Sequence, residues 1–264
     1  MSTLESDINE AWDEDEADTD LLDDFLDALN RGEVRAAEKV DGDWVANEWV
    51  KKGILLNFSE RDNRELEYGD VTYHDKFELK DTSEFLEKGT RNTPDGTVVR
   101  DGAYVGDSVI MMSPSFVNVG AHVGDGTLVD SCDTVGSCAQ IGDNVKIGAN
   151  TLIGGVLEPV EDAPVVVEDG VSIGAGARIT SGFVVGEDSV IAENTLLNPS
   201  IPVYDLVEDE VIYGEVPAER RVMQRHVKSS VEGFGEEFYK PAAVATSLED
   251  NTLEKTEKED ALRD

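Results

Sequence analysis

The sequence predicts a mainly β protein, a left-handed parallel β-helix with a small N-terminal α/β domain and a C-terminal extension. Three observations over residues 99–203 lead to this fold class. An aliphatic residue or Met recurs at every sixth position, a mostly small or aliphatic residue follows four places later, and Gly, Asn and Asp gather between them. The six-spaced residues form two runs, the second shifted in phase: Val99, Val105, Met111, Val117, Val123, Val129, Val135, Ile141, Ile147 and Ile153, then Val167, Ile173, Ile179, Val185, Ile191, Leu197 and Val203.

A period of six fits neither an amphipathic helix, with its period near 3.6, nor a flat strand, with its period of 2. Each hexad supplies one short strand and a corner, and three hexads close one triangular coil. Residues one coil apart then stack about 4.8 Å apart, so the inward side chains of one coil are buried by the next. The alternative is a β-rich domain in which Val and Ile are evenly spaced by chance.

The chain before the repeats predicts two segments. Residues 1–20 are polar and acidic, and we expect them to fray or to open a helix. Residues 21–98 predict a helical, mixed domain, because residues 21–30 carry apolar side chains at helical spacing. A strand or turn and a second helix follow, and we expect Trp44 and Trp49 to pack in a core.

The β-helix of residues 99–203 is interrupted once and is followed by a C-terminal segment. The hexad phase breaks at residues 154–166, and a loop thrown out of a regular solenoid is usually functional. Residues 204–264 predict a hairpin and then a tail that is first basic and then acidic. We expect the last residues, from Glu249, to be disordered because they are acidic and poor in apolar side chains.

The net charge limits the partners of this protein. The 264 residues carry 58 acidic and 22 basic side chains, a formal net charge of −36. Such a surface repels nucleic acid and anionic membrane, so neither is expected as a partner. We see no signal peptide and no apolar run long enough to span a bilayer, and we expect a cytoplasmic protein. The hexad spacing of Cys132 and Cys138 puts them on adjacent faces, which argues against a disulfide and fits a reducing compartment.

Carboxylates also line the predicted β-helix. Asp107, Asp125 and Asp143 recur at the coil period and should form one stacked ladder. Like charges on neighbouring strands destabilise a sheet, but the Debye length falls to about 3 Å in 1 M salt. We therefore hypothesise a halophilic host with a molar-salt cytoplasm; an ordinary acidic mesophilic protein is the alternative.

The fold by itself leaves the function open. A left-handed β-helix is most often an acyltransferase that uses an acyl-CoA or acyl-carrier thioester, but it can also be a metal-dependent, carbonic anhydrase-like enzyme or a structural module. A metal site of that kind needs several His ligands. The chain has three His, of which His122 alone lies in the repeat, so we predict no metal.

Specific motifs go further. The segments that carry a resemblance are VRAAEKVDGDWV at 34–45, WVKK at 49–52, PSFVNVGA at 114–121, GTLVD at 126–130, VGSCAQIG at 135–142 and GGVLEP at 154–159. With these motifs the chain resembles the tetrahydrodipicolinate N-succinyltransferase family, over about residues 30 to 220. The N-terminal Trp segment is the most specific, since generic hexapeptide acyltransferases lack it.

The resemblance implies an enzyme of diaminopimelate and lysine biosynthesis. Its members are homotrimers with active sites in the grooves between neighbouring β-helices. They transfer the succinyl group of succinyl-CoA, a co-substrate and not a permanently bound cofactor, to the amine of L-2-amino-6-oxopimelate, the open form of tetrahydrodipicolinate. No other cofactor is implied, and the remaining partners are small molecules.

The chemistry asks for a carboxylate that takes a proton from the ammonium, a donor for the oxyanion and a cation for the substrate carboxylates. The resemblance implies that Asp130 is the active-site Asp, which also contacts substrate. It implies that Arg91 binds substrate, and Glu158 is a second catalytic candidate. Asp130 can instead be a corner residue that caps a turn, and Arg91 a surface residue.

The chain departs from the family pattern at two places. Arg178 stands where the family commonly has an acidic residue, so Asp130 works alone or with Glu158. Asp133 occupies an inward, normally small position, where a carboxylate needs partners or a raised pKa; it is either structural or a replacement acid. For CoA we predict contacts to small residues and backbone amides of the later coils and a cation for its phosphates: Ala175, Ala192, Ser200 and Lys228, with Arg225 as the alternative cation.

Two other functions stay open at this point. An enzyme of the same fold can use another acyl-CoA, as the acetyl-CoA enzyme of the same pathway does, although the N-terminal Trp segment argues against it. A non-catalytic interaction module is the candidate from a different class. Covalent catalysis by Cys132 or Cys138 is disfavoured because neither has a His nearby in the sequence.

Overall fold

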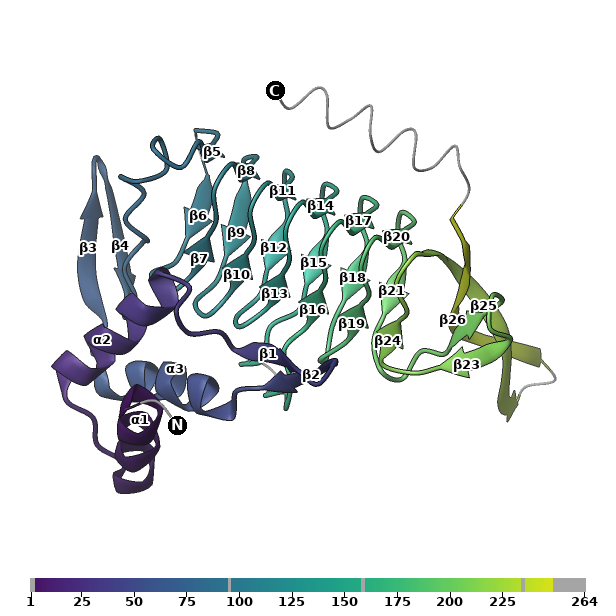
Figure 1. The fold of residues 1–264 in the computed structure, drawn as a ribbon, viewed down its shortest axis with the longest axis horizontal. Coiled ribbons are helices and arrows are strands. Elements are labelled where there is room, and N and C mark those ends of the chain that lie inside the picture. Colours follow the sequence, from purple (N-terminus) through teal and green to yellow (C-terminus); the bar gives the residue numbers. More distant parts are fainter. Residues whose placement is uncertain (1–2, 95, 158–159, 234–235, 249–264) are drawn as a thin grey trace.

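The computed structural model describes residues 3–94, 96–157, 160–233 and 236–248, and their arrangement is a parallel β-helix (Figure 1). Short strands stack into three parallel sheets, which we call faces A, B and C. Face A contains β7 (Tyr104–Val105), β10 (His122–Val123), β13 (Gln140–Ile141), β16 (Val166–Val167), β19 (Val184–Val185) and β24 (Glu215–Val216).

The chain visits the faces in the order B, C, A. Face B contains β5 (Arg91–Asn92), β8 (Ile110–Met111), β11 (Leu128–Val129), β14 (Lys146–Ile147), β17 (Ser172–Ile173), β20 (Val190–Ile191) and the start of β25 (Arg220–Gly233). Face C contains β6 (Thr97–Val99), β9 (Ser115–Val117), β12 (Thr134–Val135), β15 (Leu152–Ile153), β18 (Arg178–Ile179) and β21 (Leu196–Leu197).

The core of the solenoid is the column of six-spaced residues, and the predicted fold class is confirmed. Every member of both predicted runs is buried, and they form one continuous cluster along the axis. The register explains this, because β7, β10 and β13 pair in parallel so that Val105, Val123 and Ile141 lie above one another. Each inward side chain thus has a neighbour above and below, which burial of so short a strand requires.

The ends of the solenoid differ from the expected limits. The first parallel strand is β5, which pairs with β8, so the coils begin at Arg91 and not at Val99. Val203 is buried, but its strand β22 (Val203–Asp205) leaves the coil and pairs with β23 (Glu210–Ile212) and β26 (Glu236–Ser247). The stacking continues instead through β24 and β25, which insert Val216 and Val222 into the core.

The N-terminal segments form a second core against the solenoid. Helices α1 (Thr3–Glu14), α2 (Thr19–Asn30) and α3 (Glu48–Glu60) pack along one edge of the β-helix (Figure 1). Their buried side chains, among them Ile8 and Phe25, join Val119 and Cys138 from the coil corners in one cluster. We expected the acidic start of the chain either to fray or to open a helix. It forms helix α1, because its few apolar residues are buried.

Two hairpins complete the N-terminal region. They are β1 (Ala37–Val40) with β2 (Asp43–Ala46), and β3 (Arg64–Tyr68) with β4 (Val71–Asp75). Trp49 meets Phe25 edge to face at 5.9 Å, as expected of a core residue. Trp44 does not pack in a core: its Nε1 donates to Glu168 Oε1 of the solenoid at 2.7 Å. It thereby fixes the β1–β2 hairpin to the β-helix.

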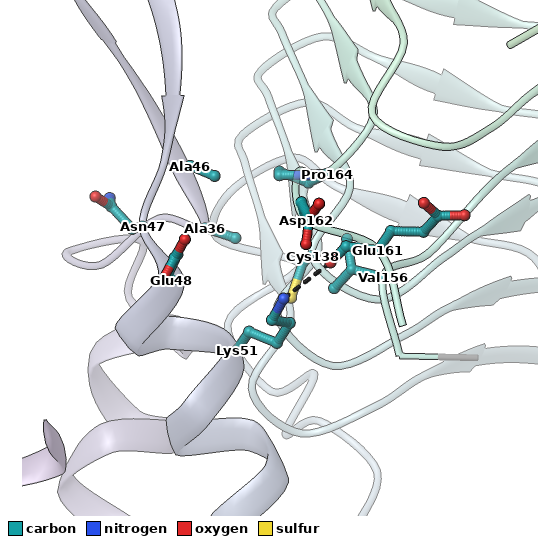
Figure 2. Close-up of a pocket in the computed structure, with 10 residues that line it drawn as sticks. All are labelled: Ala36, Ala46, Asn47, Glu48, Lys51, Cys138, Val156, Glu161, Asp162 and Pro164. Atoms are coloured by element: carbon teal, nitrogen blue, oxygen red, sulfur yellow. Dashed lines mark hydrogen bonds between the residues drawn. The ribbon is translucent and has the colours of Figure 1, made fainter. Parts of the chain in front are cut away.

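The loop between β15 and β16 lies against α3. The Lys51 Nζ donates to the Glu161 carbonyl at 2.9 Å, and Figure 2 shows this contact beside a small cavity between α3, Cys138 and Pro164. Ser181 Oγ lies 3.0 Å from Glu161 Oε1 and connects the loop to the next coil. The loop is therefore attached to both the N-terminal domain and the solenoid.

The C-terminal extension ends in a long antiparallel hairpin, β25 and β26, at the far end of the solenoid (Figure 1). The sequence predicted the short β22–β23 hairpin but described the segment after Pro217 as a tail.

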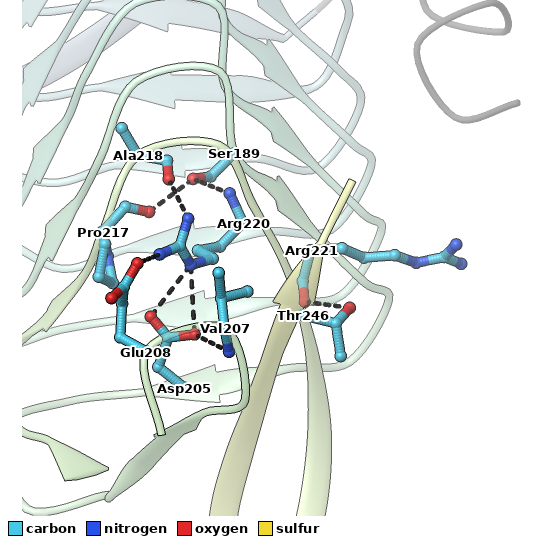
Figure 3. Close-up of polar contacts among 9 residues, drawn as sticks. All are labelled: Ser189, Asp205, Val207, Glu208, Pro217, Ala218, Arg220, Arg221 and Thr246. Carbon is cyan, nitrogen blue, oxygen red and sulfur yellow. Dashed lines mark hydrogen bonds and ion pairs between the residues drawn. The ribbon is translucent and has the colours of Figure 1, made fainter. Parts of the chain in front are cut away.

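Asp205, 1% exposed, pairs with Arg220 at 3.0 Å, and Arg220 N donates to Ser189 Oγ (Figure 3). This buried pair connects the β22–β23 hairpin to the point where β25 enters face B. The expected disorder after Glu249 concerns residues outside the described ranges.

The predicted carboxylate ladder is present at the corner between faces A and B, but it is hydrogen-bonded. Asp125 Oδ1 accepts from Asp107 N and Asp143 Oδ1 from Asp125 N, each at 2.8 Å. Gly124 leaves room for this contact, because a Cβ there would lie 2.4 Å from Asp143 Oδ1. Repulsion between stacked carboxylates, on which the sequence argument rested, is thus offset by backbone hydrogen bonds.

No helix among the described residues is long and apolar enough to cross a bilayer.

The ladder gives a test of the salt hypothesis. We expect the melting temperature to rise between about 0.05 M and about 2 M KCl, because salt screens the repulsion of a surface carrying −36. Replacing Asp107, Asp125 and Asp143 together with Asn should reduce that salt dependence, since the amide oxygen still accepts the backbone hydrogen bond while the charge is lost. Thermal melts of both proteins across a KCl series measure this. Equal melting temperatures of the wild type at both ends would contradict the hypothesis.

Candidate active site

The corner between faces B and C forms a continuous ridge along the solenoid. The ridge consists of residues 112–114, 130–132, 148–150, 174–176 and 192–194, and we call it the B–C ridge. Backbone hydrogen bonds join successive corners, for example Asn150 N to Ser131 O and Gly176 N to Ala149 O, both at 2.9 Å. Residues that are far apart in sequence are thereby placed along a single edge.

Asp130 lies on this ridge, directly after β11, with its side chain half-buried. Its Oδ1 accepts from Ser131 N at 2.7 Å, which orients the carboxylate. Its Oδ2 makes no hydrogen bond within the described part of the chain. The carboxylate is therefore held at one oxygen and available at the other, as a proton acceptor at a binding surface must be.

Asp133 lies beneath the same corner and is 2% exposed. Its Oδ2 accepts from Asp130 N at 2.7 Å and its Oδ1 from Thr151 N at 2.8 Å. Burial raises the pKa of its carboxyl to about 8, against the opposing effect of the two backbone hydrogen bonds. Asp133 is thus buried, and its carboxyl group has backbone partners.

Arg91 lies on face B, on the first strand of the solenoid, and its side chain is exposed. It pairs with Ile110, which in turn pairs with Leu128, two residues before Asp130. Two strand spacings, about 10 Å, therefore separate the strand of Arg91 from that of Asp130. The structure brings these two predicted residues onto one face.

The predicted CoA residues fall into two groups. Ala175 and Ala192 lie on the B–C ridge, beyond Asp130 along the axis. Ser200 follows β21 at the corner between faces C and A, and Lys228 lies on β25, paired with Glu237 at 2.6 Å. The first two share an edge with Asp130 in this chain, and the other two do not.

The ridge consists of small residues around Ala175. Ala175 is exposed, Gly148, Ala149 and Gly174 are half-buried, and Gly176 is buried. Within the described part of the chain, the N–H groups of Ala149 and Ala175 donate no hydrogen bond. Such N–H groups beside a carboxylate can bind carbonyl or phosphate oxygens.

Arg178 adds a cation at this point. The sequence analysis treated this position only as one that lacks an acidic residue, and not as a binding group. Its exposed side chain reaches back to the ridge and donates from Nη1 to the Gly176 carbonyl at 2.6 Å. Its place in the sequence, at the start of the strand that follows ridge residues 174–176, could have indicated a cation near the ridge. Arg178 therefore places a positive charge next to the ridge.

Glu158, the second catalytic candidate, lies outside the described residues. Its neighbours in the loop are attached at the corner between faces C and A, where Val156 joins the N-terminal cluster and Glu161 accepts from Lys51. In one chain this corner is separated from Asp130 by the width of face C.

The two thiols have different surroundings, and both are free. Cys132 is exposed on the ridge, whereas Cys138 is buried between the solenoid and the helices. Burial raises the pKa of Cys138 to about 12, which leaves it protonated and inert at neutral pH. Neither thiol gains a base from the tertiary structure among the contacts of the described residues.

The N-terminal domain contacts face A through a polar network that the sequence did not predict. Arg35 Nε donates to Gln140 Oε1 at 2.9 Å, and Lys39 pairs with Glu168 at 2.6 Å. His122 stacks on Tyr104 with ring centroids 4.4 Å apart, and burial lowers its pKa to about 3. These residues cover part of face A.

Comparisons with known proteins find relatives of this chain. A family model described as the N-terminal region of tetrahydrodipicolinate N-succinyltransferase matches residues 3–59. Proteins named 2,3,4,5-tetrahydropyridine-2,6-dicarboxylate N-succinyltransferase match from Caulobacter vibrioides, 36% identical over the whole of both chains, and from Acinetobacter baylyi, 38% identical over 92% of this chain and 88% of the relative.

A solved structure also matches. It comes from Campylobacter jejuni, is described as a 2,3,4,5-tetrahydropyridine-2-carboxylate N-succinyltransferase, and aligns with a TM-score of 0.50. The match is 15% identical and covers 86% of this chain and 63% of that chain. At this identity it supports the fold alone.

The pKa of Asp133 leads to a prediction about stability. The folded protein keeps a proton that the unfolded chain loses between about pH 4 and about pH 8, so the free energy of unfolding falls as pH rises through that window, by at most about 1.4 kcal/mol per pH unit. Replacing Asp133 with Ala should make the fall shallower. Melting temperatures from pH 5 to pH 8 at constant salt compare the two proteins, and parallel curves would contradict the raised pKa.

Proposed function

Because the chain belongs to the tetrahydrodipicolinate N-succinyltransferase family, we propose that it carries out its reaction on the B–C ridge around Asp130. The enzyme transfers a succinyl group from succinyl-CoA, its co-substrate, to the amine of tetrahydrodipicolinate in its open form, L-2-amino-6-oxopimelate. This step belongs to diaminopimelate and lysine biosynthesis. The observation that carries the placement is the half-buried Asp130 carboxylate with one free oxygen on an accessible edge.

The reaction needs a neutral amine and a stabilised oxyanion. Asp130 takes a proton from the substrate ammonium, and the amine nitrogen then attacks the thioester carbonyl. Free backbone N–H groups of the ridge, at Ala149 or Ala175, donate to the oxyanion. The attack forms the C–N bond. When the C–S bond breaks, the nitrogen loses its second proton, the CoA thiolate takes up a proton, and Asp130 releases the first proton to solvent. The products are N-succinyl-2-amino-6-oxopimelate and CoA.

The two substrates bind on either side of Asp130 in this proposal. Arg91, exposed on the same face, binds a carboxylate of the amine substrate, for which its planar guanidinium is suited. CoA lies along the small residues of the ridge near Ala175 and Ala192, and Arg178 attracts its acyl carboxylate or a phosphate. Ser200 and Lys228 take part only if another chain brings them to this edge.

We propose a homotrimer with its active sites between neighbouring chains. The support is the separation within one chain: Asp130 lies at the B–C corner, whereas the loop that contains Glu158 is attached at the C–A corner. A neighbouring subunit can bring its own loop to the first chain's ridge. Light scattering should give three times the chain mass.

The reduced thiols and the CoA substrate support a cytoplasmic location.

The catalytic role of Asp130 is tested by replacing it with Asn. Turnover should fall by about 10²-fold or more, because the amide cannot accept the proton, while its oxygen still accepts from Ser131 N and keeps the fold. CoA release is measured with succinyl-CoA and with acetyl-CoA as donor. Asp125→Asn, at the other end of β11, is the matched control and should keep wild-type turnover. Near wild-type turnover of Asp130→Asn would remove Asp130 from catalysis.

Arg91 is tested by replacing it with Lys. Loss of the two-pronged contact should raise the KM for the amine substrate more than the KM for succinyl-CoA. Arg64→Lys, another exposed Arg outside the solenoid, serves as the control. An equal rise of both KM values would indicate that Arg91 supports the structure and does not bind the amine substrate.

A further inference from the structure

Position 133 differs from the equivalent positions of the neighbouring coils. The residue two places before each six-spaced core residue points into the solenoid. Around position 133 these residues are uncharged: Ser115, Ala121, Thr127, Ala139, Val145 and Thr151. At Asp133 the same position holds a carboxyl group that is 2% exposed. Burial of a carboxyl group is costly, so the fold alone gives no reason for it.

The two oxygens of Asp133 contact two different parts of the backbone. Oδ2 accepts from Asp130 N at 2.7 Å, and Oδ1 accepts from Thr151 N of the next coil at 2.8 Å. Ser115, one coil earlier, has an Oγ with no hydrogen-bond partner among the described residues. Thr127, one hexad earlier, has an Oγ1 that accepts from Val145 N of the next coil at 3.1 Å. A hydroxyl group can therefore make the contact of Asp133 Oδ1, and the contact of Oδ2 with Asp130 N is what the carboxyl group adds.

Three short hydrogen bonds fix this backbone: Asp130 N to Asp133 Oδ2 at 2.7 Å, Ser131 N to Asp130 Oδ1 at 2.7 Å and Cys132 N to Pro114 O at 2.5 Å. Asp130 N also points to Ile147 O at 3.2 Å, and Asp133 N to Asp130 O at 3.4 Å, both longer and weaker. Because Asp130 Oδ1 is itself bound to Ser131 N, the direction of its carboxylate follows the backbone of this turn. A shift of the turn moves the free Oδ2 by a similar amount.

We infer that Asp133 is a positioning residue that holds the Asp130 carboxylate in its reactive orientation through the backbone of residues 130–133. The inference rests on the proposed role of Asp130. Asp133 does not serve as a replacement acid, since both of its oxygens are bound to backbone N–H groups and its side chain is closed off from the ridge surface.

The test is a double-mutant cycle of Asp133→Ala and Asp130→Asn in the full-length enzyme, with Ser115→Ala as the matched control. Asp133→Ala should fold, because Ala occupies the same position in neighbouring hexads. We expect its kcat to fall by about tenfold, as misplacement of a reacting group does, while the KM for succinyl-CoA stays within about twofold and the melting temperature at pH 8 does not fall. Ser115→Ala should leave all three unchanged.

The cycle separates a positioning role from the alternatives. In the Asp130→Asn background, adding Asp133→Ala should change kcat by less than about twofold, because the group that Asp133 positions is already lost. An equal loss in both backgrounds, or wild-type kcat for Asp133→Ala alone, overturns the inference and leaves the role of Asp130 intact. Wild-type kcat for Asp130→Asn alone overturns the role of Asp130 and this inference with it.

Discussion

The stacking of inward aliphatic side chains is the interaction on which the rest of this structure depends. A strand of two residues, such as β11, cannot be stable by itself, and Val129 is buried because Met111 and Ile147 lie on either side of it in the column. The three faces and the length of the solenoid follow from this contact. Once the column is formed, the outward-facing residues of the corners are free to differ from coil to coil.

The three corners use that freedom in different ways. The corner between faces A and B carries Asp side chains whose oxygens bind the backbone of the preceding coil. The corner between faces C and A packs against the helices and fixes the interrupting loop. The corner between faces B and C remains uncovered and combines Asp130 with a run of small residues, so a substrate can approach the backbone there.

Among the described residues, two carboxyl groups are buried in the solenoid, one where the chain leaves the coils and one beneath the corner of Asp130. Asp205 is buried with Arg220 where the chain leaves the coils and β25 begins. Asp133 is buried under the corner that carries Asp130. A buried ion pair adds little net stability by itself, yet each of these groups fixes a backbone conformation that the aliphatic period does not specify.

The sequence by itself determined the fold class, the inward column and the position of Asp130 at a strand end, because the period of six is a local pattern that the stacked coils repeat. It also indicated that Asp133 is buried. The tertiary structure alone decided that Val216, and not Val203, pairs with Val185 on face A, because the β22–β23 hairpin interrupts the phase. It likewise decided that Ala175 and Ala192 share an edge with Asp130 while Ser200 does not, and that the ladder carboxylates accept backbone N–H groups. These features depend on which corners of the solenoid lie above one another after an insertion. A local sequence pattern does not specify that alignment.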